Sequence, residues 1–333
     1  MNVEAYAPMR VDLAGGTLDI PPLYLFHTGS LTINMAITRY ARVHIGSSDY
    51  FRVISHDQQS SVSGSSPQEV SWHQHPELEL LLRVIHSFDL QNNATIEVSS
   101  EVPAGSGLGG SSAIAIALSA ALAQWMGRYI AKEELIERAK SLETQVIKVP
   151  AGYQDYWGAV YGGLHTYEFD LAGKMNKTAL CSDAFSQTLE DHLLLVYTTK
   201  HFSGTNNWEL FKKHMDGHKP TYDFFERLKD NAILMKEALE KEDMNLVARV
   251  LNKDWETRKC LARGITTPEI EDLTSYAFQH GSIAARACGA GGGGCVALLV
   301  DPKKKPALEQ DIAGRGMKII PCKIDQEGLR VFH

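Results

Sequence analysis

The stretch EVPAGSGLGGSSAIAIALSAAL, from Glu101 to Leu122, is the part of this sequence that most limits how the chain can fold. The residues just before the glycines, ATIEVSSEVP, alternate in polarity and predict a strand that runs straight into them. Residues 113–126 are small or apolar on nearly every side and predict a buried helix, with Ser111 and Ser112 at its start. Glycines let a backbone approach an anion closely, and a helix N-terminus attracts negative charge. We therefore interpret the turn as a phosphate-binding loop, with a plain serine-capped helix after a tight turn as the alternative.

The glycines also match G-x-G-x-x-G, at Gly105, Gly107 and Gly110, which is typical of dinucleotide-binding loops. Such a loop needs a second strand after the helix, ending in an acidic residue about 20 residues on. The next segment, AKEELIERAKSLETQV, has helical periodicity instead, so the required strand is missing. A Walker loop is excluded as well, because no lysine follows the glycines.

The bulk composition argues against several classes of protein. With 333 residues, 44% of them hydrophobic, the chain is long enough for two domains with substantial cores. A net charge of -7 argues against nucleic-acid and membrane-surface partners. The 5 cysteines form no C-x-x-C pair, which predicts reduced thiols. We find no signal-peptide pattern and no membrane-spanning run, and therefore expect a cytoplasmic protein.

Strands and helices interleave without a regular strand–helix alternation, which predicts a mixed α+β fold. Residues 1–60 predict short strands and turns, and the serine-rich residues 58–69 predict an exposed loop. Long amphipathic helices are expected over 222–241 and 244–263. We place a domain boundary near residue 180.

Three glycine-containing stretches occur in order: APMRVDLAGGTLDIPPLY near the start, PAGSGLGGSSA in the middle and CGAGGGGC near the end. They resemble, in that order, the three signatures of the GHMP small-molecule kinases, and they span nearly the whole chain. The stretches AGGTLDIPPLY, AGYQDYWGAVYGG and GAGGGGC are most similar to those of the bacterial D-glycero-D-manno-heptose 7-phosphate kinases.

This resemblance implies a two-domain fold. Residues 1–180 would form a mixed N-terminal domain that holds the phosphate loop in a left-handed β-α-β crossover. Residues 181–333 would form a ferredoxin-like C-terminal domain, with CGAGGGGC as the opposite wall of the same cleft. The implied reaction transfers the γ-phosphoryl group of MgATP to a substrate hydroxyl, so ATP and Mg²⁺ are the expected cofactors.

The resemblance also assigns roles to individual residues. Asp155 and Arg10 match catalytic residues of the family, and Glu143 with Ser111 matches its Mg²⁺ ligands. The residues matched to ATP phosphate binding are Pro103, Gly105, Ser106, Gly107, Leu108, Gly109, Gly110, Ser111 and Ser112. Those matched to substrate binding are Gly16, Thr17, Asp19, Gly289, Gly291 and Gly292.

The residue types leave alternatives open at the catalytic and metal positions. Asp155 has small and aromatic neighbours that could desolvate it and raise its pKa toward that of a base, and it could equally cap a helix. The resemblance fits two roles for Asp155: it could remove the proton of the acceptor hydroxyl, or it could only orient that hydroxyl. Glu143 lies at the buried edge of a helix and needs a partner, either Mg²⁺ or a basic residue. Ser112 is the alternative to Ser111, because Gly110 stands where many relatives have another serine.

Two positions near the start of the chain have ordinary alternatives. Arg10 would otherwise be an arginine on a strand surface. Asp19 would otherwise be a turn residue before Pro21, although a carboxylate there also suits the vicinal hydroxyls of a sugar.

The sequence departs from the family pattern at three places. Cys288 replaces the serine or threonine that commonly precedes the third glycine stretch, which removes a hydroxyl. Arg286 stands where lysine is common and keeps the charge. A basic residue expected in heptose 7-phosphate kinases coincides with Phe202, with Lys200 and His201 close enough to supply charge from a shifted position.

These features lead us to expect a kinase for a sugar or sugar phosphate. D-glycero-D-manno-heptose 7-phosphate, phosphorylated at its anomeric hydroxyl, is the first choice. Another sugar 1-kinase, acting on L-fucose or galactose, is the first alternative. The second is a sensor that binds ATP and sugar without turnover, although Arg10, Glu143 and Asp155 are all present.

Overall fold

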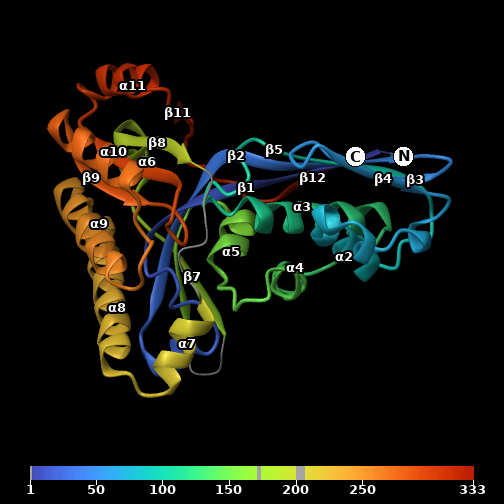
Figure 1. Ribbon diagram of the computed structural model, residues 1–333, viewed down its shortest axis with the longest axis horizontal. Helices are drawn as coiled ribbons and strands as arrows, with labels where there is room; N and C mark the ends of the chain where they lie inside the picture. The colour runs from blue at the N-terminus through green and yellow to red at the C-terminus, as the bar shows by residue number, and fades with distance from the viewer. Residues whose placement is uncertain (1, 171–173, 200–206) are drawn as a thin grey trace.

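The computed structural model describes residues 2–170, 174–199 and 207–333. Within these residues the strands form two sheets, one of eight strands and one of four (Figure 1). The larger sheet has the order β12 (Arg330–Phe332), β1 (Asn2–Ala14), β2 (Leu31–Ser47), β5 (Ala94–Ser100), β3 (Phe51–Ser55) and β4 (Ser60–Gly64). In addition, β6 (Leu164–Phe169) pairs with β2, and β7 (Met175–Ala179) pairs with β6.

Two long strands organise the larger sheet and correct the expectation of short strands near the N-terminus. β1 and β2 run for 13 and 17 residues as an antiparallel pair. β2 pairs with β6 through its first part and with β5 through its last part. Burial alternates in the first half of β1, whereas its second half is buried on both faces, because α5 (Gln154–Tyr161) and the pair α8 (Lys219–Glu240) and α9 (Met244–Lys259) also contact it.

The expected exposed loop over 58–69 is wrong, because part of it forms β4. This strand pairs antiparallel with β3, with Val62 opposite Val53. Val62 is buried while Ser61 and Ser63 are exposed, which is the alternation of a sheet with one solvent-exposed face. The serines on the exposed face give the segment the composition of a loop.

Helices cover one face of the larger sheet (Figure 1). They are α2 (Glu79–Ser87), α3 (Gly110–Trp125), α4 (Lys132–Ile147) and α5. α3 packs against β1 and β2 and is also contacted by α2, α4 and α5. A helix enclosed in this way must be apolar all round, so the prediction of a buried helix after the glycines is confirmed.

The smaller sheet has the antiparallel order β11 (Lys318–Ile319), β8 (Leu193–Thr199), β10 (Gly294–Val300) and β9 (Ser282–Ala287).

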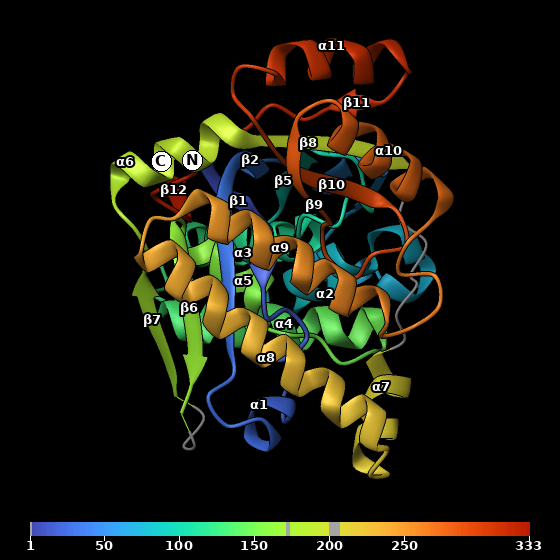
Figure 2. The same cartoon turned by 90° about the vertical axis from the view of Figure 1, so that its left-hand side faces the viewer.

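α8 and α9 pack on each other and run side by side across the first two strands of the chain (Figure 2). Their positions confirm the two predicted amphipathic helices, although α9 ends at Lys259 and not near residue 263. The other helices are α1 (Leu23–Phe26), α6 (Asp183–His192), α7 (Asn207–Met215), α10 (Pro268–Gln279), α11 (Lys305–Gly314) and the 3-10 turns Pro67–Glu69, Trp72–Gln74 and Pro76–Leu78.

The chain returns to its starting sheet at its end. β12 pairs with β1, with Phe332 opposite Glu4, so the two termini lie close together (Figure 1). The boundary expected near residue 180 lies between β7 and α6, and it stays a prediction. Among the helices of the described residues, none has the length and apolar character that a membrane span requires.

Candidate active site

Two adjoining pockets share three residues, Ser112, Glu143 and Asp155. The larger pocket has a volume of about 400 Å³ and is lined by residues 103–112 apart from Leu108. Leu108 is instead buried in the core. The smaller pocket has a volume of about 240 Å³, and its lining comes from both halves of the chain, including Arg10, Thr17, Asp19, Gln154, Arg258, Gly289 and Ala290.

The predicted phosphate loop folds back onto the start of α3. Gly105, Gly107 and Gly109 all have left-handed backbones, with φ of 73°, 75° and 75°, a conformation that glycine adopts without strain. Gly109 is the N-cap of α3, and the Ala113 amide donates to its carbonyl oxygen. The loop therefore brings the first amides of α3 to the wall of the larger pocket, the arrangement that favours an anion.

Gly107 is also a contact point between the two halves of the chain, which gives a testable prediction. A Cβ at Gly107 would lie 2.5 Å from the Cys288 carbonyl oxygen, whereas a Cβ at Gly29, with a similar φ of 80°, would meet no atom within 4 Å. We expect Gly29→Ala to lower the free energy of unfolding by about 1 kcal/mol through backbone strain, and Gly107→Ala by about 2–4 kcal/mol through strain plus the clash. Urea denaturation measures both, and equal losses would contradict the contact.

The third glycine stretch packs directly on the predicted phosphate loop. The Cys295 amide donates to the Ser106 carbonyl oxygen at 2.7 Å, and a Cβ at Gly294 would lie 2.7 Å from that same oxygen. Gly289 lines the smaller pocket, and its amide donates to Asp12 Oδ1 at 3.0 Å.

The other predicted substrate-binding glycines line neither pocket. Gly291 and Gly292 approach Ile265. Gly16 does not line the smaller pocket itself, although the nearby Thr17 and Asp19 do. Their roles in substrate binding stay predictions.

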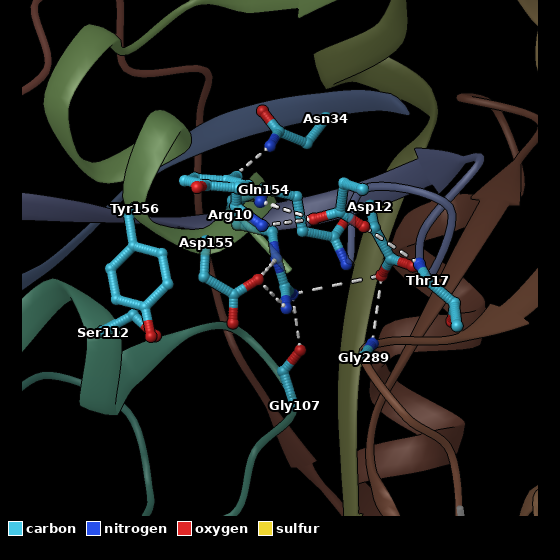
Figure 3. Close-up of polar contacts among 12 residues, drawn as sticks. Arg10, Asp12, Thr17, Asn34, Gly107, Ser112, Gln154, Asp155, Tyr156 and Gly289 are labelled. Carbon is cyan, nitrogen blue, oxygen red and sulfur yellow. Dashed lines mark hydrogen bonds and ion pairs between the residues drawn. The ribbon is translucent and has the colours of Figure 1, made fainter. Parts of the chain in front are cut away.

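Arg10 and Asp155 form an ion pair between the two pockets (Figure 3). Arg10 Nε donates to Asp155 Oδ1 at 2.8 Å, and Arg10 Nη2 lies 2.6 Å from the same oxygen. Arg10 Nη1 donates to the Gly107 carbonyl oxygen at 2.6 Å. Burial opposes the positive charge, but Asp155 and Asp12 outweigh it and raise the pKa of Arg10. Arg10 is only 3% exposed, so the alternative of a strand-surface arginine is wrong.

The surroundings of Asp155 differ from the expected aromatic enclosure. Tyr153, and not Asp155, is the N-cap of α5, so the capping alternative is wrong. The Trp157 ring stacks on Tyr153 and Tyr167, and the Tyr156 hydroxyl donates elsewhere. The Asp155 side chain is 26% exposed, and its polar partner is the guanidinium of Arg10.

Glu143 is a buried carboxylate held by hydroxyl groups. Its Oε2 accepts from Ser112 Oγ at 2.7 Å and from the Tyr156 hydroxyl at 2.6 Å. Burial raises the pKa of Glu143, although hydrogen bonds from Tyr156, Ser112 and Ser111 oppose the shift. Among the described residues no basic side chain forms an ion pair with it, so the alternative of a basic partner is not seen.

The donor set around Glu143 suits Mg²⁺. It consists of one carboxylate and the Ser111 and Ser112 hydroxyls, all of them oxygen donors, next to the loop that favours phosphate. In the part of the chain that the structure describes, no three His, Cys, Asp or Glu side chains group into a metal cage. Mg²⁺ is commonly bound through one or two carboxylates together with substrate phosphates, so an incomplete protein cage fits this ion.

Asp19 stabilises the turn that precedes α5. Its Oδ2 accepts from the amides of Tyr153 at 2.5 Å and Gln154 at 2.8 Å, and its Oδ1 accepts from the Thr17 amide at 3.1 Å. Burial raises the pKa of Asp19. The turn role is therefore present, and because Asp19 also lines the smaller pocket, its contact with a sugar stays a prediction.

Arg286 keeps its charge, but the charge is neutralised in the core. The fully buried guanidinium pairs with both Asp12 and Asp254, and it donates to the Leu13 carbonyl oxygen at 2.8 Å. The neighbouring Cys288 is a buried thiol whose pKa is raised to about 12 by burial.

Three residues at which the sequence departs from the heptose 7-phosphate kinases lie outside the described residues: Lys200, His201 and Phe202. Asp254 and Arg258 were missed by the sequence reasoning, although both lie on the apolar stripe of a helix that begins at Met244 and carries Val247 and Leu251.

Comparisons with known proteins agree with this architecture. Residues 78–163 match the model of the GHMP kinases N terminal domain, and residues 235–318 match that of the GHMP kinases C terminal domain. The chain is 27% identical over 318 residues to a D-glycero-alpha-D-manno-heptose 7-phosphate kinase of Campylobacter jejuni, covering 91% of each chain. It is 25% identical to an L-fucokinase/L-fucose-1-P guanylyltransferase of Bacteroides fragilis, covering 98% of this chain and 38% of that one.

A solved structure shows the same fold. A D-glycero-D-manno-heptose 1-phosphate kinase from Bacteroides thetaiotaomicron superimposes with a TM-score of 0.80 at 23% identity, covering 99% of both chains. Together with the two family models, this fold defines a small-molecule kinase, an enzyme that transfers a phosphoryl group to an alcohol acceptor. The chain belongs to the GHMP kinase family, whose members use ATP as the phosphoryl donor.

Proposed function

We propose that this kinase transfers the γ-phosphoryl group of ATP to the anomeric hydroxyl of a sugar phosphate, with D-glycero-D-manno-heptose 7-phosphate as the first choice. One observation carries the proposal: the pocket lined by the phosphate loop and the pocket lined by Arg10 and Asp19 meet at Ser112, Glu143 and Asp155. A donor in the larger pocket and an acceptor in the smaller one would meet at those three side chains. The similarity to the Campylobacter heptose 7-phosphate kinase supports this choice of acceptor.

The two oxygens of Asp155 have different surroundings, which gives each a role. Oδ1 is bound by Arg10, whereas Oδ2 faces the phosphate loop, 3.4 Å from the position of a Cβ on Gly109. Oδ2 accepts the hydrogen bond of the acceptor hydroxyl and receives its proton as the acceptor oxygen bonds to the γ-phosphorus and the bond from that phosphorus to the β,γ-bridging oxygen breaks, which releases ADP. Arg10 fixes the carboxylate and places positive charge beside the group in transfer.

Positioning supplies the rest of the catalysis. Amides at the start of α3 hold the phosphates of ATP, and the Asp19 turn sets the position of α5, from which Asp155 projects. Glu143 with Ser111 or Ser112 would hold Mg²⁺, which when bound neutralises charge on the phosphate oxygens.

The pH dependence of Mg²⁺ affinity tests the role of Glu143. Burial raises its pKa above the ordinary value of 4.5, so the carboxyl carries a proton at pH values where an exposed glutamate has lost it. A cation must displace that proton. We therefore expect Mg²⁺ affinity, measured by calorimetry with a non-hydrolysable ATP analogue, to weaken as the pH falls from about 7 to about 5, with proton uptake by the buffer on binding. Glu143→Gln should weaken Mg²⁺ binding and should no longer release the Glu143 proton on binding. An unchanged pH profile of Mg²⁺ affinity in that variant would contradict the role of Glu143 as a Mg²⁺ ligand.

A coupled ADP-release assay tests the proposed reaction. The acceptors should include the heptose 7-phosphate, the unphosphorylated heptose, L-fucose, D-galactose and mevalonate. We expect turnover with the heptose 7-phosphate and phosphorylation of its anomeric hydroxyl, detected by phosphorus NMR. Turnover with L-fucose instead would favour the first alternative, which rests on a fucokinase relative that matches 98% of this chain. MgATP binding without turnover on any acceptor would favour a sensor, a reading opposed by the intact contact between Arg10 and Asp155.

A further inference from the structure

Arg258 is a buried arginine in the wall of the smaller pocket, near the end of α9. Its Nη1 donates to the Gly16 carbonyl oxygen at 2.8 Å, and its Nη2 donates to the Gly289 carbonyl oxygen at 3.3 Å. The guanidinium therefore lies between the first and third glycine stretches. A guanidinium has five N–H donors, so the two bonds to described residues leave three donors for other partners. Because Arg258 lines the smaller pocket, a ligand there could reach its guanidinium.

Arg258 forms no direct ion pair with a described residue, unlike the buried Arg10 and Arg286. Arg10 is paired with Asp155, and Arg286 is paired with two aspartates. Within the described ranges, no carboxylate lies within the 4.0 Å ion-pair distance of Arg258, and its hydrogen-bond acceptors are neutral carbonyl oxygens. Burial and then Arg286 lower the pKa of Arg258, and the more distant carboxylates of Asp12, Asp254 and Asp19 only partly oppose this shift. Buried charges are normally paired, so an anionic ligand would complete this site.

The position of Arg258 indicates which ligand group it would meet. It lines the smaller pocket but not the larger one, whereas Ser112, Glu143 and Asp155 line both. In Figure 3, Ser112 lies on one side of Asp155, and Thr17 and Gly289 lie on the other. The hydrogen bonds of Arg258 to Gly16 and Gly289 thus place it at the end of the acceptor pocket remote from the Ser112–Glu143 site.

We propose that Arg258 binds the phosphate group that the acceptor already carries, at the end of the sugar remote from the reacting hydroxyl. This inference rests on the proposed kinase function and assigns its preference for a phosphorylated acceptor to one side chain. Arginine suits the role, because its planar fork matches phosphate oxygens in a bidentate contact. Gly16 and Gly289 hold the fork in place, so little side-chain freedom is lost on binding.

The test compares a phosphorylated acceptor with an unphosphorylated one. We expect Arg258→Gln to lower kcat/KM for D-glycero-D-manno-heptose 7-phosphate by about 100-fold, mainly through KM, because a charged hydrogen-bonded contact is lost. For the unphosphorylated heptose, and for the KM of ATP, the change should stay within about threefold, because neither contacts the lost cation. Arg258→Lys should recover part of the preference, and Lys253→Gln, an exposed charge removed from the same helix, should change nothing.

Each outcome separates this inference from the proposed function. If Arg258→Gln lowers kcat/KM equally for both acceptors, Arg258 only joins the two glycine stretches, and the inference is wrong while the kinase reaction stands. If the wild-type enzyme prefers the unphosphorylated heptose, the inference is also overturned. If the wild-type enzyme phosphorylates neither heptose, the proposed function itself fails. Thermal melting of each variant checks that it is folded, and a folded Arg258→Lys variant keeps the comparison decisive.

Discussion

Asp155→Asn is expected to lower kcat by about 10³-fold while leaving ATP affinity within about twofold. An amide keeps the size of the side chain but cannot take the proton of the acceptor hydroxyl. The substitution also weakens the ion pair that, in the proposed mechanism, holds Arg10 beside the group in transfer. The proposal places the nucleotide on the loop amides, so we expect ATP binding not to depend on this carboxylate.

Kinetics and nucleotide titration measure the two effects separately. The matched control is Asp223→Asn, which makes the same chemical change at an exposed position on α8. A variant of Asp155 with nearly normal kcat would overturn its catalytic assignment. A variant that loses ATP affinity as well as kcat would show that Asp155 supports the phosphate loop and does not act on the acceptor alone.

Arg286→Met should cause the largest loss of stability. The substitution leaves the buried carboxylates of Asp12 and Asp254 without their shared cation, and breaking a buried pair in this way typically costs about 3–5 kcal/mol in the free energy of unfolding. Asp12 also binds the Gly289 amide, so the third glycine stretch should loosen too. Urea denaturation measures the loss, with Arg249→Met on the exposed face of α9 as the control.

The same variant has an expected pH signature. Burial disfavours ionised Asp12, but Arg286, Arg10 and Arg258 outweigh it and lower its pKa from 3.8 to about 2. A carboxyl with a lowered pKa in the folded state stabilises the protein above its unfolded pKa, and this contribution is lost as the pH falls. Without Arg286, burial is expected to raise the pKa of Asp12 in the folded variant, and burial already raises that of Asp254. The gap between wild type and Arg286→Met should therefore be full at neutral pH and shrink as the pH falls, from above about pH 4 down to about pH 2. A gap that stays constant through this range would mean that packing, and not charge, accounts for the loss.

The glycine turn between a strand and a buried helix could be predicted from the sequence because its signal is local, whereas phosphate binding there stays a prediction. The strand, the cluster of glycines and the helix follow one another directly between Ala94 and Trp125, and local order decides that geometry. The ion pair of Arg10 with Asp155 could be expected only through the family resemblance, because its members lie far apart along the chain. Asp155, Arg10 and Glu143, which the resemblance assigned to the site, do line one pocket, together with Ser112, the alternative to Ser111.

What the sequence did not reveal depends on distant partners. Arg286 was expected only to keep the charge of the usual lysine, and its buried pairing with Asp12 and Asp254 could not be foreseen. Arg258 could not be placed, because its partners Gly16 and Gly289 belong to opposite ends of the chain. A usable signal was the pair of charged residues on the apolar stripe of α9, since charges at such positions need buried partners. The lengths of β1 and β2 were misjudged because helices from the C-terminal half cover them.

The main-chain contact between Ser106 and Cys295 has a consequence for how the protein is made. During synthesis the glycine loop emerges early, together with the strand and helix that flank it. The segment that supports the loop from the other side, residues 288–295, emerges only after α8, α9 and α10 have been made. A nascent chain therefore holds this loop without its contact to residues 288–295 until those residues have been made, near the end of synthesis.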